Sequence, residues 1–180
     1  MKDLTIEEYF NLKMIDQYAY DTIYSAYKLK DTFAGKEQRL NDLTYNEMKT
    51  LFSLISDFSE KTTIVRIYCI FFDIEEQEFY KQKASDFYAA AKFVRSSIES
   101  VMMREAKLLK RSENKNTEKW KAATGNTLDP YKNLLPLIKI GKEFGMFPHD
   151  LGSRKYSEIL TILTAMTKTE EAELRFNEMK

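Results

Sequence analysis

The residue types that support most enzyme chemistry are scarce in this sequence. Its 180 residues include a single histidine, His149, and a single cysteine, Cys69. One histidine cannot supply a two-histidine metal site, and a Ser-His-Asp triad would have to use His149, which follows Pro148 in an expected turn. A solvated or capping histidine is typical of such a turn. Cys69 lies in an apolar run and is interpreted as a small buried hydrophobic residue.

Carboxylates cluster at Asp73, Glu75, Glu76 and Glu78. Carboxylate metal bundles usually add inward-facing Glu-x-x-His pairs, and the sequence has none. We interpret the cluster as the solvated start of a helix, where the helix dipole stabilises acidic groups. Neither Gly-x-x-x-x-Gly-Lys nor Gly-x-Gly-x-x-Gly occurs. The sequence therefore predicts a protein that is not an enzyme and needs no cofactor or metal, and an enzyme using carboxylates alone is the least favoured alternative.

A basic segment runs from Arg104 to Lys121, with seven basic and three acidic residues and a local charge of +4. Such a segment can contact a nucleic-acid backbone and stack a base on an aromatic ring. The candidate nucleic-acid contacts are Lys115, Lys119, Trp120 and Lys121. A solvated helix end explains the charges more simply, because cations complement the C-terminal dipole. With 28 basic and 28 acidic residues in the whole chain, no overall charge steers it to a polyanion.

Five glycines and three prolines are few, and together with the periodicity of apolar residues they predict helices. Three Thr-x-x-Glu capping boxes mark expected helix starts, at Thr5, Thr44 and Thr167. The pattern predicts helices over about 5–30, 44–58, 62–72, 79–111, 130–145 and 153–178, the last of them broken or bent near Thr167. Residues 62–72 would also suit a strand, but no partner strand is visible in the sequence.

We expect an all-α fold, a multi-helix bundle with one long central helix and a C-terminal helical hairpin. Residues 1–111 would form an N-terminal helical bundle, 112–129 a polar connector, and 130–180 a C-terminal helical subdomain packed on the bundle, unless all three form a single domain. No apolar run approaches the roughly 20 residues that span a bilayer, so no membrane segment is expected.

A short phrase occurs twice near the start of the chain. Asp3-Leu4-Thr5 before Glu8 is matched 39 residues later by Asp42-Leu43-Thr44 before Glu47. We interpret the match as convergent helix capping rather than as a true repeat.

Tyrosine and phenylalanine together number 23, and their spacing points to a contact surface. Tyr18, Tyr20, Tyr24 and Tyr27 cannot all face inward on one helix at 100° per residue. Some of these tyrosines must be exposed or meet a partner, as is common at protein interfaces.

The C-terminal third resembles a known family. Residues 140–151, read as Ile-Gly-Lys-Glu-Phe-Gly-Met-Phe-Pro-His-Asp-Leu, and 156–160, read as Tyr-Ser-Glu-Ile-Leu, are similar to a phrase in small helical morphogenesis proteins of tailed bacteriophages, of the tail assembly chaperone type. In that phrase an amphipathic helix ends in Phe-Gly, and a proline turn precedes the next helix start. The likeness covers about 40 of the 180 residues and leaves out the long helix expected at 79–111.

The resemblance implies a protein that works by binding other proteins in the host cytoplasm. The expected partners are phage tape measure, tail tube or neck proteins, and the residues implied in packing and partner binding are Phe144, Phe147, Leu151, Tyr156 and Ile159. The long helix equally suits a structural head-to-tail connector or ring subunit, a homo-oligomer that stays in the virion. A nucleic-acid accessory factor using residues 104–121 is the third alternative.

Overall fold

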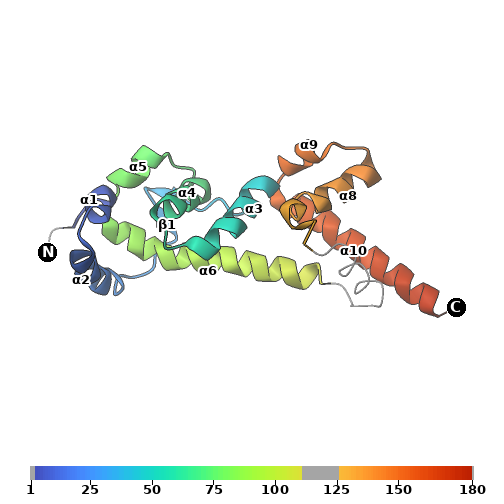
Figure 1. The fold of residues 1–180 in the computed structure, drawn as a ribbon, viewed down its shortest axis with the longest axis horizontal. Coiled ribbons are helices and arrows are strands. Elements are labelled where there is room, and N and C mark those ends of the chain that lie inside the picture. Colours follow the sequence, from blue (N-terminus) through green and yellow to red (C-terminus); the bar gives the residue numbers. More distant parts are fainter. Residues whose placement is uncertain (1–2, 111–125, 180) are drawn as a thin grey trace. The chain divides into compact units, whose positions relative to one another are not determined.

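The computed structural model describes residues 3–110 and 126–179 (Figure 1). It is mostly helical, which confirms the predicted all-α class. The helices and 3-10 turns of the described residues are α1 (Ile6–Phe10), α2 (Met14–Tyr24), α3 (Tyr45–Leu54), η1 (Ile55–Asp57), α4 (Lys61–Phe72), α5 (Glu76–Lys81), α6 (Ala84–Leu108), η2 (Asp129–Tyr131), α8 (Leu135–Phe144), α9 (Pro148–Gly152) and α10 (Tyr156–Glu178). The predicted helix at 62–72 is confirmed as α4.

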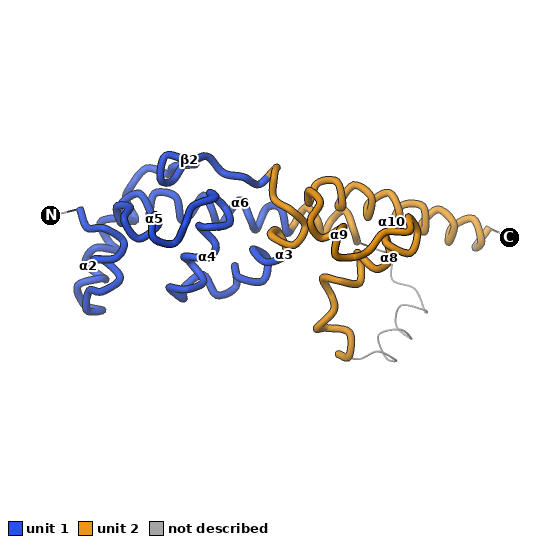
Figure 2. Tube along the Cα trace, turned by 90° about the horizontal axis from the view of Figure 1, so that it is seen from above, with its two compact units in different colours: residues 1–40, 50–102 blue, residues 41–49, 103–180 orange. Residues whose placement is uncertain are grey.

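The chain divides into two compact units, each assembled from two separate stretches (Figure 2). Unit 1 comprises residues 1–40 and 50–102, and unit 2 comprises residues 41–49 and 103–180. Helices α3 and α6 each contribute residues to both units. The sequence predicts a division at residue 111, whereas unit 2 also contains residues 41–49. These nine residues lie far upstream, and no change in local composition marks them.

Two of the three predicted capping boxes are confirmed. The Thr5 and Thr44 hydroxyls accept the backbone N–H groups of Glu8 and Glu47, and each glutamate accepts the N–H of its own threonine in return. The third is wrong, because Thr167 is buried within the continuous helix α10. Residues 153–180 contain no glycine or proline that would break this helix.

Three predicted helices are interrupted. The helix expected at 130–145 is reduced to the 3-10 turn η2 and helix α8, with turn residues 132–134 between them. The helix expected at 5–30 divides into α1 and α2, since Lys13 is extended and begins a new helix. The helix expected from 79 to 111 breaks between α5 and α6, where Lys83 pairs with Thr5 in an isolated antiparallel bridge. This pairing joins residues far apart in the sequence, so the local apolar pattern could not show it.

A small hairpin, absent from the sequence prediction, follows α2 in unit 1. Strands β1 (Thr32–Phe33) and β2 (Lys36–Glu37) are antiparallel, and both turn residues, Ala34 and Gly35, have positive φ angles of 52° and 72°. Positive φ at both central residues is the type I′ geometry that matches the twist of a tight hairpin. The hairpin places Phe33 among the core aromatic rings of Tyr68, Phe72 and Phe79.

Candidate protein-binding face

The turn between α8 and α9 in unit 2 is set by glycine. Helix α8 ends at Gly145, whose φ of 66° is in the left-handed region, and the backbone N–H groups of Gly145 and Met146 both donate to the carbonyl oxygen of Gly141. A Cβ atom on Gly141 would lie 2.5 Å from the Met146 carbonyl oxygen. The backbone therefore folds back closely here, as the Phe-Gly and proline phrase in the sequence indicated.

Two aromatic side chains flank this turn and face solvent. Phe144 is 58% exposed at the end of α8, and Phe147 is 78% exposed just before Pro148. Phe144 and Phe147 together with the turn between them are called the aromatic turn below. Exposed aromatic residues of this kind are enriched at protein interfaces.

The other three residues implied by the resemblance lie in the core of unit 2. Leu151, Tyr156 and Ile159 are all at most 5% exposed. In this structure they pack the unit, and only Phe144 and Phe147 of the five present an accessible surface. A role of the five residues in partner binding stays a prediction.

Tyr156 anchors a nearly buried polar network in unit 2. Its hydroxyl donates to Glu105 Oε2 at 2.7 Å, and Glu105 also pairs with the ammonium group of Lys49. The Lys49 and Glu105 side chains are only 12% and 17% exposed, and Tyr45 stacks on Tyr156 with ring centroids 6.4 Å apart. Burial, followed by the hydrogen bond to Glu105, raises the pKa of Tyr156 well above its usual value. The network fixes the start of α10 beside α3.

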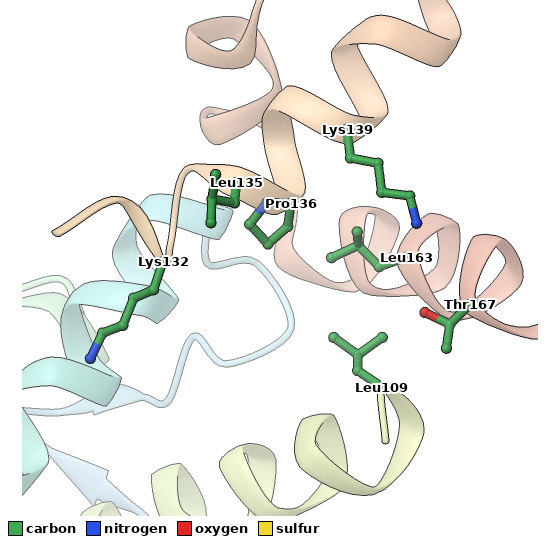
Figure 3. Close-up of a pocket in the computed structure, with 7 residues that line it drawn as sticks. All are labelled: Leu109, Lys132, Leu135, Pro136, Lys139, Leu163 and Thr167. Atoms are coloured by element: carbon green, nitrogen blue, oxygen red, sulfur yellow. The ribbon is translucent and has the colours of Figure 1, made fainter. Parts of the chain in front are cut away.

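A shallow apolar cavity of about 260 Å³ lies between α8 and α10 in unit 2 (Figure 3). Its lining residues are Leu109, Lys132, Leu135, Pro136, Lys139, Leu163 and Thr167. Lys139 pairs with Glu170, while the Lys132 side chain extends away from the other lining groups. The lining offers hydrophobic contact from leucine and proline side chains and includes two lysines.

Unit 1 holds helix α2 through a hydroxyl and carboxylate cluster. The hydroxyls of Tyr9 and Tyr88 both donate to Asp21 Oδ1, each at 2.5 Å. Burial, followed by the hydrogen bond to Asp21, raises the pKa of Tyr9 from its usual 10 to about 12, and the same two causes raise the pKa of Tyr88 further. Three apolar or aromatic residues of α2 are open to solvent, with Met14, Ile15 and Tyr18 each more than three-quarters exposed.

These tyrosines predict a loss of stability at alkaline pH. A phenol whose pKa is higher in the folded than in the unfolded chain contributes stability that is complete below the unfolded pKa of about 10, and loses it as pH rises towards the folded value. We expect the melting temperature to stay level from about pH 8 to 10 and to fall between about pH 10 and 12. Circular dichroism melts across this range test the expectation, with phenolate absorbance followed in parallel.

The double variant Tyr9→Phe/Tyr88→Phe provides the control for this titration. It removes both hydroxyls from Asp21 and keeps both rings, so the fall in melting temperature above about pH 10 should become smaller. An unchanged fall in the variant would contradict the assignment to this cluster.

The single histidine and the single cysteine both lie within the described residues. His149 is exposed in the first turn of α9, and Cys69 is half-buried, with a pKa raised by burial. Within residues 3–110 and 126–179 no group of three or more His, Cys, Asp or Glu side chains could hold a metal ion. Lys115, Lys119, Trp120 and Lys121 lie outside the described residues.

No protein-family model, curated protein sequence or solved structure matches this chain. In the described part of the chain no helix is long and apolar enough to cross a membrane.

Proposed function

We propose that this chain is a non-enzymatic protein-binding protein of tailed-phage assembly, of the tail assembly chaperone type. The observation that supports it best is the aromatic turn, where Phe144 and Phe147 are exposed within the phrase that resembles this family. The partners proposed from the resemblance are tape measure, tail tube or neck proteins.

The backbone and the side chains of the aromatic turn both suit protein binding. Phe144 and Phe147 flank a backbone turn that is closed by two hydrogen bonds to the Gly141 carbonyl oxygen, so binding needs little ordering of the backbone. Aromatic anchors on a pre-organised backbone are the usual centres of binding energy at protein interfaces.

The experiment is co-purification of a tagged chain from cells that produce the other proteins encoded beside it, followed by mass spectrometry. We expect a tail or neck protein at a defined ratio, retained in moderate salt. The variant Phe144→Ser/Phe147→Ser should retain less of that protein by at least about tenfold, because loss of two aromatic anchors costs more than the 1.4 kcal/mol that tenfold represents. Recovery of the tagged chain alone would contradict the proposal.

The exposed side of α2 favours a second candidate, a self-associating structural connector or ring subunit. Met14, Ile15 and Tyr18 form an apolar face on one helix, and such faces are commonly covered in assemblies. Light scattering with size exclusion separates the two candidates. A ring subunit gives a closed oligomer whose mass falls to the monomer in the variant Ile15→Glu/Tyr18→Glu, whereas a chaperone of the kind proposed remains small with or without these substitutions.

A further inference from the structure

The two units contain the same arrangement of three helices, at a constant spacing of 72 residues. Helix α4 ends at Phe72 and α8 at Phe144, each followed by a left-handed residue, Asp73 with φ 56° and Gly145 with φ 66°. The following short helices begin at Glu76 and Pro148, and the long helices begin at Ala84 and Tyr156. Each pair of positions differs by 72 in the sequence numbering.

The hydrogen bonds at these equivalent positions also agree. The N–H of Ile74 donates to Cys69 O, as the N–H of Met146 donates to Gly141 O. Burial follows the same register, since Phe79 and Leu151 are both almost completely buried. The agreement therefore extends from the backbone to the core.

The repeated Asp-Leu-Thr phrase completes each arrangement. In unit 1 the N–H of Ile6 donates to Gln82 O and the N–H of Ala84 to Leu4 O; in unit 2 the N–H of Tyr45 donates to Arg154 O and the N–H of Tyr156 to Leu43 O. The bridges Thr5 with Lys83 and Thr44 with Lys155 are thus equivalent. Convergent capping does not explain this agreement, since both phrases make the same long-range pairing. The two copies are interleaved along the chain. Residues 42–44, which belong to the second copy, come after residues 3–5 and before helix α4 of the first copy.

In unit 1 the hairpin covers one face of this arrangement. The Phe33 ring lies 5.6 Å from that of Phe72, and Phe33 and Phe72 are both almost completely buried. Lys36 donates to the carbonyl oxygen of the left-handed residue Asp73, and the backbone N–H of Arg39 donates to Phe71 O. The hairpin therefore supplies one aromatic ring and a basic group at the helix end.

The equivalent face of unit 2 is open at its edge. The counterpart of Phe72 is Phe144, which is 58% exposed, and the counterpart of the Asp73 carbonyl is that of Gly145. The counterparts of Tyr68 and Phe79 are Ile140 and Leu151, which are buried and apolar. Unit 2 therefore exposes the Phe144 ring, whose counterpart in unit 1, the Phe72 ring, is covered by the hairpin.

We propose that this face of unit 2 binds a tight turn of a partner protein that carries one aromatic side chain followed by a lysine or arginine. The aromatic ring would pack on Phe144 as Phe33 packs on Phe72, and the cation would donate to the Gly145 carbonyl as Lys36 does to that of Asp73. The occupant is a different protein, because the hairpin of each copy of this chain is already packed in its own unit 1. The inference rests on the proposed protein-binding function and names the chemistry of its partner.

The test uses a peptide of residues 30–39 of this chain as the probe, because it contains the hairpin that covers the equivalent face. Titrated into the full-length protein, it should shift the backbone NMR signals of residues 140–152 with a dissociation constant on the order of 1 mM, as a single aromatic contact allows. A peptide with Phe33→Ala should give no shift. The protein variant Phe144→Ser should lose at least about tenfold in affinity, and it should fold because the ring it loses is largely exposed.

The matched control is Phe147→Ser. The counterpart of Phe147 in unit 1 is Glu75, whereas the Phe33 ring packs against Tyr68, Phe72 and Phe79. Phe147→Ser should leave the peptide affinity within about twofold. Absence of shifts in residues 140–152, or equal losses in Phe144→Ser and Phe147→Ser, would overturn the inference. Partner proteins that co-purify while the peptide fails to bind would leave the proposed function standing and refute only this face.

Discussion

Replacing Phe79 by alanine is expected to lower the free energy of unfolding by about 3–5 kcal/mol. The Phe79 side chain is fully buried, and its ring lies within 5.3–6.4 Å of the rings of Phe10, Phe33, Tyr68, Tyr80 and Phe87, measured between centroids. Alanine would leave a cavity that five aromatic neighbours cannot fill without moving. Urea denaturation followed by circular dichroism measures the change.

The matched control is Phe147→Ala, which removes the same side chain from an exposed position. Because Phe147 is 78% exposed, this substitution should change the free energy of unfolding by no more than about 0.5 kcal/mol. Similar losses in the two variants would show that Phe79 does not lie in the core as described.

Replacing Glu105 by alanine is expected to cost roughly 3 kcal/mol, the second largest effect. The substitution removes a carboxylate from the nearly buried ammonium of Lys49 and removes the acceptor of the Tyr156 hydroxyl. Buried polar groups that lose their partners pay the cost of desolvation without compensation. Chemical denaturation of the variant measures the loss, and hydrogen exchange locates it in unit 2.

Glu99→Ala serves as the comparison for this network. Glu99 pairs with Arg95 on the exposed surface of α6, with both side chains at least 45% exposed. Exposed pairs of this kind contribute about 0–1 kcal/mol, so this variant should be almost as stable as the wild type. If Glu105→Ala were equally mild, the network would not support the start of α10.

The sequence predicted those parts of the fold that depend on neighbouring residues. The capping boxes at Thr5 and Thr44 act within one helical turn, and Gly145 ends a helix through its own backbone conformation. The sequence shows no partner strand for the apolar run of 62–72, which favours a helix there, and α4 confirms this prediction.

The parts that failed depend on contacts between distant residues. The break before Ala84 follows from the pairing of Lys83 with Thr5, and an apolar pattern read along one helix contains no sign of it. The Thr167 box failed for a related reason, since its spacing suits a helix start but its buried side chain lies within a continuous helix.

The candidate site was predicted in part. The Phe-Gly and proline phrase located the aromatic turn, but it could not tell exposed Phe144 from buried Ile159, because both are apolar residues at helical spacing. The hairpin has only a weak local signal, because Gly35 suits a positive φ angle whereas Ala34 does not. The 72-residue correspondence keeps few identical residues, such as Lys83 with Lys155 and Ser85 with Ser157, so the sequence alone does not show it, whereas the helix boundaries and the long-range hydrogen bonds do.

The most direct test of the account is hydroxyl-radical footprinting of the wild-type protein, with phenylalanine oxidation read by mass spectrometry. We expect fast oxidation of Phe144 and Phe147 and strong protection of Phe33, Phe72 and Phe79, which are at most 2% exposed. We also expect a bound partner to protect Phe144. Protection of Phe144 equal to that of Phe72 in the isolated protein would contradict the open face of unit 2 and the binding function built on it.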